Sequence, residues 1–216
     1  MKQKEETFAK GICFKKIFWL FMVGCVFGCV FEMVNHFIHY GDWVSRRGLI
    51  YGPLNPVYGL GLVFFVIFLS KIKNPALIFL GGMLLGGGCE YLCSLVQEKV
   101  FGTLSWDYSH QLFNIGGRTS LKYMLIWGVL ALVVMKIVYP FLSNLIEKMP
   151  VKTGNILTII LIVFMVANII ISVTACLRQS ERASGMAPSN KVELFLDKHY
   201  PDKRLNNIFQ NAKRQK

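Results

Sequence analysis

Hydrophobic and polar residues alternate along this chain in long blocks. Five apolar runs each approach about 20 residues, the length at which a helix crosses the hydrocarbon core of a bilayer. These runs cover residues 17–38, 52–70, 75–95, 121–141 and 156–177. Short polar or basic segments separate the runs. The pattern therefore predicts an all-α fold, a polytopic helical membrane bundle of about five transmembrane helices.

Composition supports this class and sets the domain limits. Of the 216 residues, 54% are hydrophobic and only 17% are charged. The net charge of +12 does not indicate nucleic-acid binding, because the basic residues gather in the tails and at the span edges, where they anchor membrane helices. We expect a basic N-terminal tail (1–16), a transmembrane domain (17–177), and a linker with a basic tail (178–216).

The two C-terminal stretches differ in character. The run at 156–177 is almost uniformly aliphatic and holds only Asn168 as a strong polar group, which predicts a peripheral, lipid-facing helix. From residue 178 onward we expect a linker. It is followed by a basic amphipathic helix, broken at Pro201, that could lie on lipid headgroups or dock on a soluble partner.

A proline-rich and glycine-rich stretch opens the second run, and its sequence is RRGLIYGPLNPVYGLG. Prolines remove backbone donors, so the carbonyls they free need protein or water partners at membrane depth. We expect this stretch to be buried in protein, and a re-entrant hairpin is the alternative to a full span here. Its candidate structural residues are Gly52, Pro53, Pro56, Tyr58 and Gly59.

The first run carries a polar stripe with one-four spacing. Gly24, Gly28, Glu32 and His36 recur every four residues and so share one helix face. Glycines allow close helix approach, and an intramembrane carboxylate is expected to face the bundle interior with a partner.

The third run repeats this spacing with Gly82, Gly86 and Glu90. An aromatic and acidic loop follows each stripe, then one or two arginines, then another apolar run. The loop residues that we expect at the membrane interface are Trp43, Trp106, Asp107 and Tyr108. We therefore consider that residues 17–70 and 75–141 form two parallel helix-loop-helix repeats.

The chain resembles a family of bacterial membrane proteins in several long stretches of sequence. The stretches are RRGLIYGPLNPVYGLG, GGGCEYLCSLVQEKVFGTLSWDYS with the following FNIGGRTSLKY, and FLDKHYPDKRLNNIF. They are similar to the family described as "Putative ABC-transporter type IV", the CmpB-like permeases. Ser105 departs from it, since the family more often has a second tryptophan there. The resemblance implies a transport permease of the cell membrane and assigns no catalytic or substrate-binding residue.

The residues favour a transporter membrane subunit. Glu32, His36 and Glu90, with the proline-rich stretch, supply polar groups and irregular backbone at membrane depth. No G-x-x-x-x-G-K-[ST] phosphate loop occurs, so we expect any ATP-binding subunit to be a separate chain. The alternative is structural, with the glutamates paired with Arg47, Arg118 or His36 and only stabilising the bundle.

Two other functions stay open. A membrane-embedded enzyme could bind a metal through Glu32, His36 and His39, with Glu90 or Asp107 completing the shell, although no H-E-x-x-H or G-x-S-x-G motif occurs. An accessory or regulatory membrane protein would bind partners through the tail. We assign no catalytic residue, metal or cofactor. The expected partners are the lipid bilayer and an ATP-binding subunit, with a homo-oligomer left open.

Overall fold

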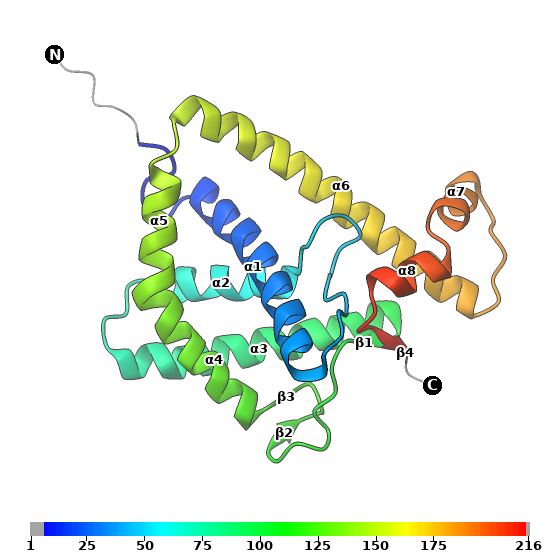
Figure 1. Cartoon of the computed structure of the whole chain (residues 1–216), viewed down its shortest axis with the longest axis horizontal. Helices are drawn as coiled ribbons and strands as arrows, with labels where there is room; N and C mark the ends of the chain where they lie inside the picture. Colours follow the sequence, from blue (N-terminus) through cyan, green and yellow to red (C-terminus); the bar gives the residue numbers. More distant parts are fainter. Residues whose placement is uncertain (1–6, 215–216) are drawn as a thin grey trace.

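A computed structural model describes residues 7–214. The fold is nearly all-α, as predicted, and Figure 1 shows its elements in chain order. The helices are α1 (Phe14–Tyr40), α2 (Pro56–Leu69), α3 (Pro75–Phe101), α4 (Leu121–Val133), the π-helical turn η1 (Val134–Val138), α5 (Tyr139–Glu147), α6 (Val151–Ala183), α7 (Lys191–His199) and α8 (Asp202–Ile208).

Four helical segments are long and apolar enough to cross a membrane. They are α1, α3, the continuous segment Leu121–Glu147, and α6. The shorter apolar helix α2 has 14 residues. At 1.5 Å per residue it spans only about 21 Å, less than the ~30 Å hydrocarbon core. Together these segments confirm the polytopic helical bundle of about five membrane helices.

Helix α2 begins at Pro56, later than the residue 52 expected from hydropathy, because Asn55 caps it. The Asn55 side chain accepts a hydrogen bond from the Val57 backbone N–H at 3.2 Å, and Pro56 occupies the first turn. Helix α3 begins with the same device: Asn74 accepts from Ala76 at 2.9 Å. An asparagine cap followed by proline is a strong helix start, so the chain before residue 55 is a loop.

The first helical hairpin is held by glycines on α1 that face α2. A Cβ atom on Gly24 would lie 3.0 Å from the Gly59 Cα atom and 3.1 Å from the Tyr58 carbonyl oxygen. One turn further on, a Cβ on Gly28 would lie 2.1 Å from Cγ of the Tyr58 ring. Only glycine at these two positions lets the backbone and ring of α2 approach α1 so closely.

The second hairpin repeats these contacts with a different ring. A Cβ on Gly82 would lie 3.1 Å from the Trp127 carbonyl oxygen and 3.3 Å from the Gly128 Cα, and a Cβ on Gly86 would lie 2.4 Å from Cγ of Trp127. In each hairpin the second helix returns across the first (Figure 1). The matched glycine contacts support two repeats of a helix-loop-helix unit. The hairpins adjoin at Tyr58 and Trp127, whose ring centroids are 6.1 Å apart.

Loops and tail gather at the end of the bundle far from the start of α1 (Figure 1). The loop after α3 contains β2 (Asn114–Ile115), paired antiparallel with β3 (Thr119–Ser120). Its first strand, β1 (Thr103–Leu104), pairs antiparallel with β4 (Lys213–Arg214) at the end of the tail. The tail is therefore tied back to the loop that follows α3.

The tail forms two helices on either side of Pro201, as the sequence predicts, but its apolar face packs on the bundle. Leu196, Tyr200, Leu205 and Ile208 form one buried cluster with Ile50 and Ala175. Arg178, at the end of α6, donates hydrogen bonds to both carboxylate oxygens of Asp197, at 2.9 and 3.0 Å. Leu194 and Phe195 on α7 stay more than half exposed, so only part of the apolar surface of the tail is covered by the bundle.

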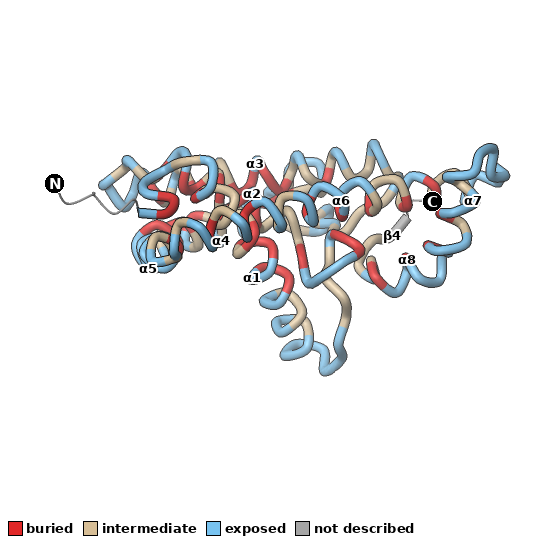
Figure 2. Tube along the Cα trace, turned by 90° about the horizontal axis from the view of Figure 1, so that it is seen from above, coloured by how far each residue is buried: buried red, intermediate tan, exposed pale blue. Residues whose placement is uncertain are grey.

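Buried positions concentrate where the helices contact one another, whereas the outer surface of α6 is largely exposed in the isolated chain (Figure 2). The C-terminal half of α1 projects from the layer that the other helices form (Figure 2). Glu32 lies in this projecting half and its side chain is 35% exposed, whereas Glu90 on α3 is 7% exposed. The two glutamates therefore differ in burial despite their matching sequence positions.

Candidate functional site

Glu90 is held by hydroxyl groups from the loop between α3 and α4. Tyr108 donates to Oε1 at 3.0 Å, and Thr119 donates to Oε2 at 2.9 Å. The Trp127 side chain lies beside the same carboxyl group. Within residues 7–214, no lysine, arginine or histidine forms an ion pair with Glu90. A buried carboxyl group with neutral partners is unusual, because burial of a charge favours a paired cation.

Glu32 has a comparable aromatic partner but also a cation. The Tyr58 hydroxyl donates to Glu32 Oε1, and Arg46 Nε lies 3.9 Å from Oε2. The guanidinium of Arg46 also contacts His36 Nδ1 at 2.8 Å, and His36 Nε2 lies 3.3 Å from Asp42. These contacts form a chain of polar groups along the projecting half of α1.

The carboxyl groups of Glu90 and Glu32 both affect the pKa of Tyr108. Burial, followed by the charge and hydrogen bond of Glu90, raises the pKa of Tyr108, and Glu32 adds a smaller effect in the same direction. Tyr108 also stacks on Tyr123 with ring centroids 4.0 Å apart. Tyr108 therefore stays protonated and donates its hydrogen bond to Glu90.

The ion pairs differ from those that the sequence suggested for the glutamates. Arg118 pairs with Glu98 and donates to Ser94 at 3.3 Å, so it does not reach Glu90. Arg47 donates through Nε to Ser45 at 3.1 Å and pairs with neither glutamate. The cation near Glu32 is Arg46, which sequence reasoning passed over in favour of its neighbour.

Helix α6 fixes the proline-rich loop, a role that sequence reasoning missed. Asn168 is 1% exposed, donates to the Tyr51 carbonyl at 2.8 Å and accepts from the Tyr51 N–H at 3.1 Å. Ser172 accepts from the Ile50 N–H at 2.9 Å. The loop is thus anchored to α6 through the backbone of Ile50 and Tyr51. Tyr51, Gly52 and Pro53 are nevertheless exposed in the isolated chain, so the expectation of burial in protein is wrong for the turn that holds Pro53. The signal for Asn168 was its place as a lone strong polar group in an aliphatic helix.

The aromatic loop residues take different positions. Trp43 is 59% exposed and stacks on Phe37, with centroids 4.6 Å apart. Trp106 donates its indole N–H to the Arg118 carbonyl at 2.9 Å, which closes the loop after α3. Asp107 accepts from the Ser109 N–H at 2.9 Å, and this bond lowers the pKa of Asp107.

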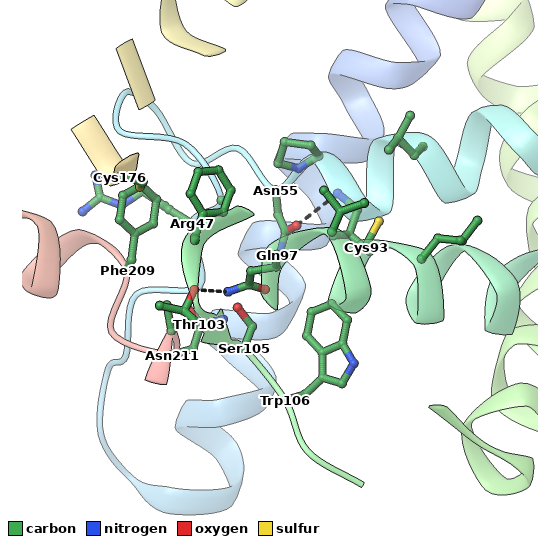
Figure 3. Close-up of a pocket in the computed structure, with 18 of the residues that line it drawn as sticks. Arg47, Asn55, Cys93, Gln97, Thr103, Ser105, Trp106, Cys176, Phe209 and Asn211 are labelled. Atoms are coloured by element: carbon green, nitrogen blue, oxygen red, sulfur yellow. Dashed lines mark hydrogen bonds between the residues drawn. The ribbon is translucent and has the colours of Figure 1, made fainter. Parts of the chain in front are cut away.

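A cavity of about 790 Å³ lies between α2, α3, the end of α6 and the tail. Figure 3 shows Arg47, Asn55, Gln97 and Thr103 around its polar part, and Gln97 donates to Thr103 at 3.1 Å. Tail residues reach the same space. The volume is within the ~300–1,000 Å³ typical of small-molecule sites. Hydropathy alone could not reveal this cavity, because its walls come from segments far apart in the sequence.

The metal-site alternative gains no geometric support. Among residues 7–214, no group of three or more histidine, cysteine, aspartate or glutamate side chains is arranged to hold a metal ion. His39 instead contacts the Asn35 carbonyl at 2.8 Å.

These features define a multi-pass α-helical membrane protein built around two glycine-packed hairpins. The model of the family described as "Putative ABC-transporter type IV" matches residues 19–173, which is well over half of the chain. The chain belongs to this family, and the resemblance seen in the sequence is confirmed. No curated protein and no solved structure matches the chain.

Proposed function

We propose that this chain is the membrane subunit of a transport system of the bacterial cell membrane and that a separate chain supplies ATP hydrolysis. The family is described as an ABC-transporter type, which supports a transport role over an enzymatic one. The 216 residues contain no G-x-x-x-x-G-K-[ST] phosphate loop. The energy for transport would therefore come from a partner.

One observation carries this proposal: the buried Glu90 carboxyl group bonded only to neutral donors between the two hairpins. Ionisable groups at membrane depth are costly and are typically retained where a substrate or ion passes. A purely structural glutamate would be expected to have a cationic partner, as Glu98 has in Arg118. Each hairpin holds one such carboxyl group bonded by a tyrosine hydroxyl, Glu32 by Tyr58 in the first and Glu90 by Tyr108 in the second.

The test is copurification from the native membrane, followed by ATPase measurement in proteoliposomes. We expect an ATP-binding chain to copurify and its ATPase rate to depend on this subunit. The Glu90→Gln variant should keep the partner but reduce the subunit-dependent ATPase rate at least about tenfold, the loss typical for a group that acts during turnover. Glu181→Gln, at a carboxylate that is 41% exposed, is the matched control and should behave like the wild type.

Two results would contradict the proposal. One is the absence of any ATP-binding partner under conditions that preserve the native complex. The other is a Glu90→Gln variant with full coupled activity, which would leave Glu90 a structural role.

A further inference from the structure

The cavity between α2, α3, α6 and the tail has two chemically distinct halves. Its membrane half is lined by Leu60 and Phe64 from α2 and by Leu92 and Val96 from α3. Its other half carries most of the amides and hydroxyls, beside the rings of Trp106 and Phe209 (Figure 3). The polar residues are Asn55, Gln97, Thr103, Ser105, Asn206 and Asn211. Such a division matches a ligand with one apolar end and one polar end.

The apolar half opens toward the bilayer. Leu92 is 58% exposed and Val96 is 55% exposed in the isolated chain, although both line the cavity. Both residues lie on α3, one of the candidate membrane spans. A ligand in the cavity could therefore keep its apolar part in contact with lipid, which a water-soluble solute would not need.

The polar half has a cation without a carboxylate partner. Arg47 lies at the edge of the cavity near Cys176 and Phe209 (Figure 3), and its Nε donates only to Ser45. Among residues 7–214, no carboxylate forms an ion pair with Arg47. Asp202 also lines the cavity, but Arg182 holds its carboxylate at 2.6 Å.

A neighbouring groove strengthens the positive charge at this edge. Arg47 also lines a shallow depression, whose other charged lining residues are Lys203 and Arg204. No aspartate or glutamate lines this depression. Three cations at one edge favour an anionic group, and arginine suits phosphate or carboxylate because its planar donors bind two oxygens.

We propose that the cavity binds an amphiphile with an anionic head group, its apolar chain lying between α2 and α3 and its head group beside Arg47. This inference rests on the proposed function, since it names the class of molecule that the transport system would carry. The head group could belong to a bilayer phospholipid or to a single-chain lipid, because both present the same anionic chemistry.

Native cysteines can report whether the cavity is occupied. Cys93 and Cys176 line the cavity and are partly exposed, and Cys13, which is also partly exposed, lies outside it and serves as the control. The full chain is placed in phosphatidylcholine nanodiscs, and maleimide labelling of each cysteine is followed by peptide mass spectrometry. Hexadecyl phosphate should slow labelling of Cys93 several-fold and leave Cys13 unchanged. Hexadecanol has a similar chain without charge and should protect much less.

Matched variants locate the two halves of the site. Arg47→Gln should raise the concentration of hexadecyl phosphate for half-protection about tenfold, the size of a charge-assisted hydrogen bond. Lys198→Gln, at an exposed cation outside the cavity, should have no effect. Val96→Trp should abolish protection by filling the apolar half, whereas Val100→Trp, one turn further along α3 and outside the lining, should not.

Further labelling experiments distinguish a bilayer phospholipid from a single-chain lipid as the source of the head group. Protection by phosphatidylglycerol as well would assign a bilayer phospholipid, and protection by hexadecyl phosphate alone would assign a single-chain lipid. The inference is overturned if hexadecanol or inorganic phosphate protects Cys93 as well as hexadecyl phosphate does. It is also overturned if no compound protects Cys93, or if Cys93 is never labelled. These assays contain no ATPase, so their failure is distinct from failure of the transport proposal.

Discussion

Replacement of Gly86 by alanine tests the close packing of the second hairpin. The new Cβ would lie 2.4, 2.5 and 2.6 Å from Cγ, Cβ and Cδ2 of Trp127, whereas ordinary contacts begin near 3.4 Å. The base of the indole would therefore have to move by about 1 Å. Tyr58 and Phe65 restrict this movement, since both rings have centroids 6.1 Å from that of Trp127.

Gly88 provides the control on the same helix. A Cβ there would have no neighbour within 4 Å. Both replacements gain about 0.5–1 kcal/mol of helix stability because alanine has less backbone freedom to lose. That gain cancels between the two variants, so their difference isolates overpacking, which costs about 1–3 kcal/mol in a well-packed core.

The assay is reversible unfolding in mixed micelles by titration with sodium dodecyl sulfate. We expect Gly86→Ala to have a free energy of unfolding about 1–3 kcal/mol below that of Gly88→Ala. If the two variants agree within about 0.5 kcal/mol, the close approach of α3 and α4 is not a source of stability and the reasoning is refuted.

Three further predictions concern the loop and the tail. Asn168→Leu should leave the Tyr51 backbone N–H and carbonyl without their partner, at a cost of about 1–3 kcal/mol each, and should speed amide exchange at Tyr51. Thr174→Val loses bonds only within α6 and should leave the exchange rate at Tyr51 unchanged. Arg178→Gln should release the tail from the bundle and increase its proteolysis, and unchanged cleavage would contradict the role of this ion pair. The hydrogen bond from Arg178 lowers the pKa of Asp197, so its stabilisation is complete above about pH 3.9 and is lost as the pH falls through the lowered pKa. Proteolysis of the tail should therefore be constant from about pH 8 to 5 and rise only below about pH 4.

Hydropathy and one-four spacing predicted the parts of the fold that depend on local chemistry. Apolar length located α1, α3, α4 with its continuation, and α6, because each must satisfy its backbone within one helix in the bilayer. The recurrence of Gly82 and Gly86 after Gly24 and Gly28 predicted close helix pairing, and each of these four glycines faces a partner helix.

The ion pairs could not be predicted from the sequence, because they depend on the path of loops. Arg46 and Arg47 are adjacent, and only the folded loop decides that Arg46 approaches Glu32. Likewise, Arg118 could reach either Glu90 or Glu98 by sequence spacing, and the turn between β2 and β3 directs it to Glu98.

The role of α6 was misjudged for a related reason. Average hydropathy describes the surface that a helix shows to lipid, whereas one buried asparagine can fix a distant loop through two bonds. The cavity depends on several segments at once. Its lining joins residues of α2 and α3 to tail residues more than 100 positions later, a relation that no local pattern contains.

The pairing of β1 with β4 has a practical consequence for anyone who purifies this protein. Asn211 and Ala212 lie at the cavity rim, and β4 follows them directly (Figure 1). An affinity tag fused after residue 216 would therefore emerge within a few residues of that rim and could block entry. A tag placed ahead of α1, whose first residues lie at the end of the molecule away from β4 (Figure 1), avoids this interference.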